Sequence, residues 1–301
     1  MDATWIDTLI LPWQRRKILS GPAASSRKDV HFVQLTAATL RYRISGQGPK
    51  TIVLVTDPPV VLEQYDDLIW YLAGDYRVVV FEMAAFGFSL PHLGTPFHFE
   101  SAVGIVREFL TRLDLGPSVL AFPCAAAYMA IALAGWHPEL VSDLVIIQAP
   151  DWHEEQKWKR TRDPKNILGR PYIGQILISL LKRRRVGDWY RLALGNPALL
   201  DEFLQPTLEA FGRGARFSLA SSFQKYLTEA EPAFAPVRQP TLIVWGKNDR
   251  SHCKTDMAST LRYAPHAQLV YLPETGHFPE LERPKEFANL LHGFFRNSST
   301  E

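Results

Sequence analysis

Short apolar runs and longer amphipathic stretches alternate along the chain. The runs hold four or five residues, many of them β-branched, which is typical of strands buried on both faces of a parallel sheet. They lie at Thr51–Val55, Arg77–Phe81, Ser118–Phe122, Leu144–Ile147 and Thr241–Trp245, and a further strand is expected at Gln268–Leu272. Helical patterns lie between or after these runs, at Ser101–Leu113, Ala125–Trp136, Ala258–Tyr263 and Pro284–Phe295. The alternation predicts an α/β domain with a mostly parallel sheet flanked by helices.

Two segments depart from this alternation. Residues 1–30 predict a helical lead-in followed by a linker that starts at Gly21-Pro22, and a hairpin pattern comes next, at His31–Leu35 and Thr39–Ile44. Residues 151–236 show no buried strand, and amphipathic helices dominate them, such as Ile173–Leu181 and Pro206–Phe211. We therefore expect a helical cap at residues 151–236, inserted into a core formed by residues 31–150 and 237–297.

Composition narrows the class of protein. The 301 residues are 47% hydrophobic and 21% charged, as in ordinary soluble globular proteins. A formal net charge of +2 gives no basic field for nucleic acid. The longest apolar run, Cys124–Ala134, is too short for a membrane span of ~20 residues. Two cysteines cannot build a disulfide framework, and the N-terminus is too acidic for a secretory signal, so we expect a cytoplasmic protein.

One stretch of the expected cap is strongly basic. Residues 151–185 hold ten Lys and Arg against four Asp and Glu, which is +6 locally. One interpretation is a solvated helix face. The other is a basic rim, including Lys182–Arg185, that attracts an anionic substrate or an acidic carrier protein.

Three reactive side chains follow expected strands directly. Cys124 comes after Ser118–Phe122, Asp249 lies four residues past Trp245, and His277 follows Gln268–Leu272. Ligands bind outside the carboxyl ends of the strands in an open parallel sheet. The sequence therefore predicts a site that combines a nucleophile, an acid and a histidine, in that order along the chain.

This order resembles the α/β-hydrolase family. Four stretches carry the resemblance, which spans roughly residues 30–297 with the cap in place: Tyr76–Ser89, Trp136–Val141, Pro240–Asp249 and Gly276–Pro279. The family's G-x-S-x-G string is absent. In family members the nucleophile lies about fourteen residues before the proline of an H-P-E motif, and counting back from Pro138 gives Cys124. The resemblance implies an enzyme with the α/β-hydrolase fold, its cap inserted before the acid-bearing strand.

The resemblance assigns a role to each triad residue. Cys124 would attack as a thiolate generated by His277, and Asp249 would orient the imidazole and stabilise its cationic form. The alternative for Cys124 is a small buried hydrophobic residue. We expect His252 and His153 at the surface or the rim of the site. No metal-ligand spacing, G-x-G-x-x-G string or P-loop occurs, so no metal or cofactor is expected.

Three departures from the family pattern surround the expected nucleophile. Phe122 and Ala126 replace the elbow glycines, and cysteine replaces serine. Thr56-Asp57-Pro58-Pro59 stands where the family has H-G-x-P. Because Pro58 has no N–H, the oxyanion hole would rely on the N–H of Ala125, with the Thr56 hydroxyl as a candidate second donor. Asp57 would repel an oxyanion if ionised, or else is a solvated turn residue.

Three functions remain open at this point. The first is a cysteine acyl enzyme, that is an esterase, thioesterase or acyltransferase, acting on a small acyl substrate that coenzyme A or a carrier protein could hold. The second is a non-hydrolytic lyase or cyclase with His277 as general base, and the third is a non-catalytic binding protein. Six aromatic residues of the cap suggest an apolar substrate, and the first of them is a candidate binding residue: Trp152, Trp158, Trp189, Tyr190, Phe203 and Phe217.

Overall fold

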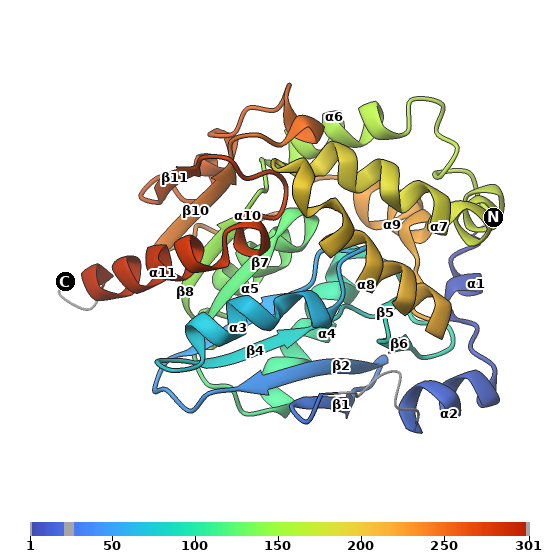
Figure 1. Ribbon diagram of the computed structural model, residues 1–301, viewed down its shortest axis with the longest axis horizontal. Coiled ribbons are helices and arrows are strands. Elements are labelled where there is room, and N and C mark those ends of the chain that lie inside the picture. The colour runs from blue at the N-terminus through green and yellow to red at the C-terminus, as the bar shows by residue number, and fades with distance from the viewer. Residues whose placement is uncertain (1, 21–26, 299–301) are drawn as a thin grey trace.

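A nine-stranded sheet runs through the computed structural model, which describes residues 2–20 and 27–298 (Figure 1). Its strands are β1 Val30–Gln34, β2 Ala38–Ser45, β3 Thr51–Val55, β4 Arg77–Phe81, β6 Leu90–Pro91, β7 Ser118–Pro123, β8 Val141–Ile147, β10 Thr241–Gly246 and β11 Gln268–Leu272. Their order is β1-β2-β4-β3-β7-β8-β10-β11, and β6 pairs with β2. The β1–β2 hairpin and the β2–β4 and β2–β6 pairs are antiparallel, whereas the strands from β4 to β11 are parallel. The five buried strands predicted from the sequence form, as do the strand at Gln268–Leu272 and the hairpin. Strand β11 lies at the edge of the sheet and is half-exposed.

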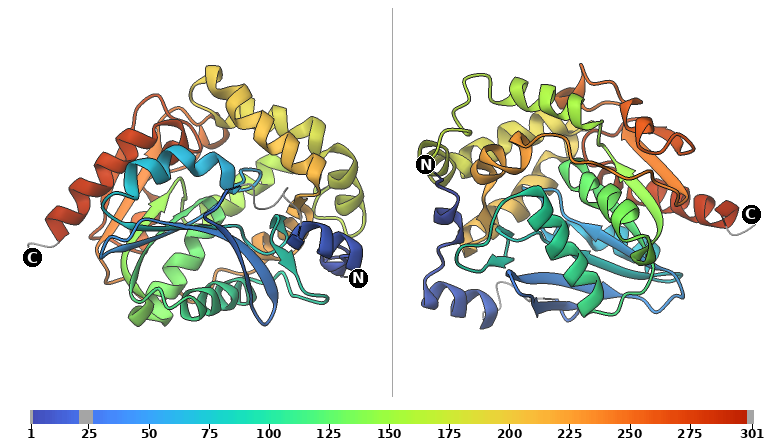
Figure 2. Two further views of the ribbon diagram at one scale, coloured as in Figure 1. Left: turned by 60° about the horizontal axis from the view of Figure 1, so that its bottom comes forward. Right: turned by 180° about the vertical axis from the view of Figure 1, so that it is seen from behind.

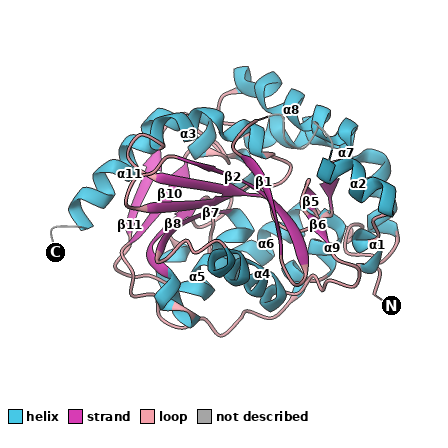
Figure 3. Ribbon diagram, turned by 90° about the horizontal axis from the view of Figure 1, so that it is seen from below, coloured by secondary structure: helices cyan, strands magenta, loops and turns pink. Residues whose placement is uncertain are grey.

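Helices cover both faces of this sheet. Helices α3 (Asp66–Leu72) and α11 (Pro284–Ser298) lie on one face, and α4 (Phe99–Arg112) and α5 (Ala127–Trp136) lie on the other (Figures 2 and 3). The prediction of a helix at Ala258–Tyr263 is wrong, because only the 3₁₀ turn Ser259–Arg262 forms there. Pro265 follows closely, so the segment is too short to repay the cost of helix nucleation.

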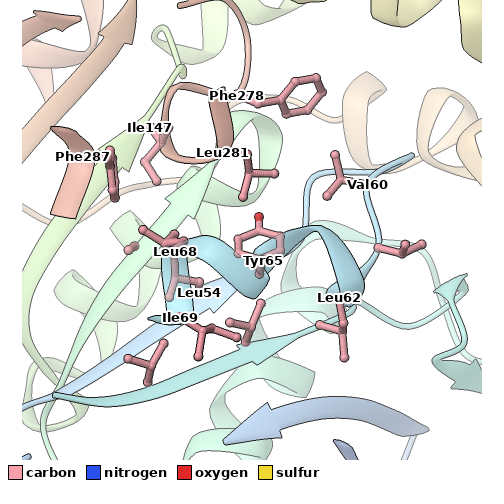
Figure 4. Close-up of a cluster of buried hydrophobic side chains, with 14 of the residues drawn as sticks. Leu54, Val60, Leu62, Tyr65, Leu68, Ile69, Ile147, Phe278, Leu281 and Phe287 are labelled. Carbon is pink, nitrogen blue, oxygen red and sulfur yellow. The ribbon is translucent and has the colours of Figure 1, made fainter. Parts of the chain in front are cut away.

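Side chains along each central strand alternate between two hydrophobic clusters. In β3, Ile52 and Leu54 belong to the cluster under α3 and α11, whereas Val53 and Val55 belong to the cluster under α4 and α5. Figure 4 shows the first cluster, where Leu54 lies close to side chains of α3. Because both faces of the sheet are covered, the strands are apolar at nearly every position rather than at every second one.

Between β8 and β10 the chain leaves the sheet and forms most of its remaining helices. These are α6 Trp152–Arg162, α7 Ile173–Ala193, α8 Leu200–Arg213 and α9 Leu219–Gln224. Helix α7 packs against α8 and α9, as Figure 1 shows. One two-residue strand, β9 (Arg216–Phe217), pairs with β5 (Phe86–Gly87) and ties this region to the core.

The N-terminal segment forms two helices, α1 (Trp5–Thr8) and α2 (Pro12–Ser20). The Asp7 carboxylate accepts a hydrogen bond of 2.6 Å from the Ser221 hydroxyl, which attaches α1 to α9. The linker expected from Gly21 onward falls on residues 21–26, outside the described part of the chain. Of the helices that are described, none has the length and apolar character needed to cross a lipid bilayer.

Candidate active site

Cys124 lies at a sharp turn from strand to helix. Strand β7 ends at Pro123, Cys124 has a φ of +49°, and the 3₁₀ turn Cys124–Ala126 leads directly into α5. A non-glycine residue in this left-handed region is strained by about 1–3 kcal/mol, and such strain clusters at functional sites. The Phe122 side chain, at one of the two elbow positions where glycine is missing, is fully buried in the core, with its ring 5.8 Å from that of Phe81.

His277 and Asp249 form a fully buried pair. The Nδ1 atom of His277 lies 2.7 Å from Asp249 Oδ2. Asp249 also accepts hydrogen bonds from the Gln148 side chain at 2.9 Å and the Ser251 N–H at 2.7 Å. Burial alone would raise the pKa of Asp249, but the charge and hydrogen bond of His277 lower it to about 2. The carboxylate therefore stays ionised and fixes the imidazole ring.

A second carboxylate faces the other nitrogen of the same ring. Asp57 Oδ2 lies 3.0 Å from His277 Nε2, and these two atoms and Cys124 Sγ lie within 4.8 Å of one another. Burial disfavours a charged imidazole, but Asp249 and then Asp57 and Cys124 outweigh it, so the pKa of His277 is raised well above its ordinary value. These two carboxylates therefore favour the protonated, imidazolium form of the ring.

The same surroundings keep the Cys124 thiol protonated. Burial, and then the charges of Asp57 and Glu155, raise its pKa to about 12. The start of α5 and His277 act in the opposite direction, but they do not overcome these effects. The resting site thus holds a neutral thiol beside an imidazolium, and not the thiolate that the sequence led us to expect.

The residues expected at the oxyanion position line one cavity with Cys124. They are Thr56, Asp57, Pro58 and Ala125. The buried Thr56 hydroxyl oxygen has no hydrogen-bond partner within residues 2–20 and 27–298, so it is free to donate to a substrate. Pro58 has no N–H to donate.

This cavity has a volume of about 750 Å³ and opens beneath α6 and α7. Trp158, Trp189 and Phe217 line it, as expected for an apolar substrate. Four side chains of the basic stretch at residues 151–185 also line it: Arg162, Lys165, Lys182 and Arg185. Two further acids lie there with their own partners, because Asp163 accepts backbone N–H bonds after α6 and Asp188 pairs with Arg185 at 3.3 Å.

Two expectations about individual side chains are wrong. Trp152, a candidate binding residue, is absent from the described cavity lining and packs edge-on against Tyr128 and Phe99. His252, expected at the surface or the rim of the site, is fully buried and stacks between Trp158 and His277 at centroid distances of 5.2 and 5.3 Å. Burial lowers its pKa to about 3, so His252 is neutral. His153 is exposed, as expected.

Glu155 of α6 is the acid that the sequence analysis missed. It is 1% exposed and lines the cavity. The buried residues of α6 are Trp152, Glu155 and Lys159, which follow a helical spacing. This periodicity is the one feature of the sequence that could have indicated that Glu155 is buried.

Two sets of three side chains lie close enough to share a metal ion. They are Asp57, Cys124 and His277, and Asp249, His252 and His277. In the second set the His277 Nδ1 atom is already engaged with Asp249.

Comparisons with known proteins agree on the architecture. A model of the alpha/beta hydrolase family matches residues 60–290. A 2-hydroxy-6-oxononadienedioate/2-hydroxy-6-oxononatrienedioate hydrolase of Burkholderia vietnamiensis is 22% identical over 87% of this chain and 92% of its own length. Of the solved structures, a Bacillus megaterium epoxide hydrolase with an inhibitor has a TM-score of 0.70 at 17% identity, covering 88% of this chain and 100% of that chain. Est816, described as an N-acyl homoserine lactone degrading enzyme, has a TM-score of 0.65 at 19% identity, with coverage of 88% and 100%.

Proposed function

Because the chain belongs to the alpha/beta hydrolase family, we propose that it is a hydrolase that attacks an acyl carbon with Cys124, assisted by His277 and Asp249. The fold class predicted from the sequence is confirmed. One observation carries the proposal. Cys124 stands at the strained turn between β7 and α5, within reach of a histidine whose far nitrogen is held by Asp249 at 2.7 Å.

Deprotonation of the thiol begins at the contact between Asp57 and His277. The imidazolium passes its Nε2 proton to the Asp57 carboxylate, 3.0 Å away. The neutral ring then accepts the Cys124 proton while the sulfur–carbon bond forms. Asp249 stabilises the imidazolium that results. Asp57 thus accepts and holds a proton during the reaction. Because it is then neutral, it does not repel the oxyanion as a charged carboxylate at this position would.

The oxyanion that develops on the acyl oxygen needs donors. The N–H of Ala125 at the start of the helical turn is one, and the unpartnered Thr56 hydroxyl is the other. Loss of one such donor typically costs about 100- to 1,000-fold in rate. Thr56 therefore compensates for the missing N–H of Pro58.

The cavity favours an apolar acyl substrate with an anionic far end. Glu155 lies near the reacting groups, whereas Arg162 lies seven residues further along α6, about 10 Å along the helix axis. Arg162 and Lys165 could bind a carboxylate or phosphate there. The Burkholderia relative is named for a dioate substrate, which agrees with such a charge, as does a thioester of coenzyme A or a carrier protein.

A second candidate is a non-hydrolytic lyase or cyclase in which His277 acts as general base. The raised thiol pKa and the contact between Asp57 and His277 favour it, because both allow proton transfer without a covalent intermediate. A non-catalytic role would leave the strain at Cys124 and the buried Asp249–His277 pair without a purpose.

Three variants separate the two enzymes. For the cysteine hydrolase, Cys124→Ala and His277→Ala abolish turnover of a butyryl thioester, and Cys124→Ser changes the covalent intermediate to an ester. Activity retained in Cys124→Ala but lost in His277→Ala would refute the nucleophile and support the lyase or cyclase. Retention of activity in all the variants would refute both.

A further inference from the structure

Glu155 has no structural partner that accounts for its burial. Both of its carboxylate oxygens lack a hydrogen-bond partner within the part of the chain that the structure describes. Its neighbour Glu154, by contrast, is paired with Lys157. Burying an unpaired carboxylate costs free energy, so a carboxyl group kept at this position is expected to be protonated and to serve the cavity that it lines.

The charged and titratable groups that act on Glu155 all belong to the reacting centre. His277 and Asp57 act on its carboxyl group, and Glu155 in turn acts on the side chains of Cys124, Tyr128 and Tyr226. Of these groups, Asp57 and His277 have side-chain atoms within 4.8 Å of the thiol sulfur. Glu155 therefore faces the place where an acyl substrate would react.

His277 is poorly suited to protonate a leaving group. The Asp249 carboxylate, 2.7 Å from Nδ1, stabilises the charged form of the ring throughout the reaction. The more strongly this carboxylate stabilises the imidazolium, the weaker an acid the imidazolium is. General acids work best with a pKa near the working pH, and burial raises the pKa of Glu155 to about 7.

We propose that Glu155 is a catalytic general acid that protonates the leaving group when the acyl–leaving-group bond breaks. This inference rests on the proposed cysteine hydrolase. Cys124 sulfur forms a bond to the acyl carbon, the bond from that carbon to the leaving oxygen or sulfur breaks, and the Glu155 proton moves to the leaving atom.

The second half of the reaction restores every proton. Water attacks the thioester and gives a proton to the Glu155 carboxylate. The departing Cys124 thiolate takes a proton from the imidazolium, and the proton held by Asp57 returns to His277. The sum is one acyl compound and one water converted into one acid and one alcohol or thiol.

The leaving group provides the test. We would measure the rate of acyl transfer to Cys124 by intact mass, with the 4-nitrophenyl and the ethyl ester of butyric acid. Glu155→Gln should lower the rate with the ethyl ester by roughly 100-fold. It should change the rate with the 4-nitrophenyl ester by less than about threefold, because that leaving group needs no proton. The matched control is Glu154→Gln, on the same helix and outside the cavity lining, which should change neither rate.

A measurement on the unmodified protein gives the same information if Glu155→Gln fails to fold. The rate with the ethyl ester should fall above pH 7, as Glu155 ionises, and the rate with the 4-nitrophenyl ester should not. If Glu155→Gln or a rise in pH slowed both esters equally, Glu155 would not be the general acid. The proposed hydrolase would still stand in that case, provided that Cys124 became acylated. If neither ester acylated Cys124, the proposed function and this inference would both fail.

Discussion

The Asp57 carboxylate lies 3.0 Å from Nε2 of His277, the ring nitrogen that is not bound to Asp249. Neither of these two atoms has a hydrogen bond of good geometry to any described residue. The contact is therefore a close approach without an aligned hydrogen bond, and it contributes to the raised pKa of both His277 and Cys124.

Replacing Asp57 should make the thiol more reactive. Burial and then the Asp57 charge are the main causes of the raised pKa of Cys124. In Asp57→Asn the burial remains and the charge is gone, so the thiol pKa falls. At a fixed pH below the thiol pKa, each unit by which that pKa falls gives a tenfold larger thiolate fraction. We expect alkylation of Cys124 by iodoacetamide at pH 8 to be at least about tenfold faster.

The exposed thiol of Cys253 is an internal control for this experiment. Peptide mapping reports both cysteines in one sample, and alkylation of Cys253 should be unchanged. A Cys124 rate equal to that of the unmodified protein would show that Asp57 does not govern the thiol.

The basic side chains of the cavity should select for substrate charge. Arg185 lines the cavity, whereas Arg184 on the same helix is outside its described lining. Arg185→Gln should lower kcat/KM for a butyryl thioester of coenzyme A by roughly three- to tenfold at low salt, and leave ethyl butyrate unaffected. High salt should remove the difference.

Arg184→Gln is the matched control, since it removes the same charge outside the cavity. If both variants reduced kcat/KM equally, the basic stretch would be only a solvated face. An unchanged kcat/KM in Arg185→Gln would have the same meaning.

Glu155 should make the stability of the protein depend on pH. Burial raises its pKa from an ordinary 4.5 to about 7, so the folded protein keeps a proton that the unfolded chain releases within this interval. The free energy of unfolding therefore falls as pH rises from about 4.5 to 7, and its contribution is then constant. At 1.36 kcal/mol per unit, the loss is at most roughly 3 kcal/mol.

Urea unfolding at several pH values measures this loss. As pH rises from about 4.5 to 7, the free energy of unfolding of Glu155→Gln should increase relative to that of the unmodified protein. Glu154→Gln should show no such change. A pH-independent difference for Glu155→Gln would mean that Glu155 ionises normally in the folded protein.

The sequence predicted the central strands because both faces of the sheet are covered, which leaves a continuous apolar run at each of them. Thr51–Val55 and Arg77–Phe81 form strands with these same bounds. It also placed Cys124, Asp249 and His277 together, since each follows a parallel strand and parallel strands end at one edge.

The sequence did not indicate which individual polar side chains are buried. His252 is buried because Trp158 of α6 covers it, and nothing near residue 252 indicates this packing. Asp57 precedes two prolines, which fits an exposed turn equally well, and only the folded chain shows it beside His277. Both positions depend on contacts between segments distant in the chain, which local patterns do not encode.

Intact mass of the protein after a brief reaction with 4-nitrophenyl butyrate tests the central claim most directly. The account predicts one butyryl group on Cys124, located by peptide mapping, absent in Cys124→Ala and formed at least about 100-fold more slowly in His277→Ala. Product formation with an undiminished rate in Cys124→Ala, or a butyryl group on any other residue, would contradict it.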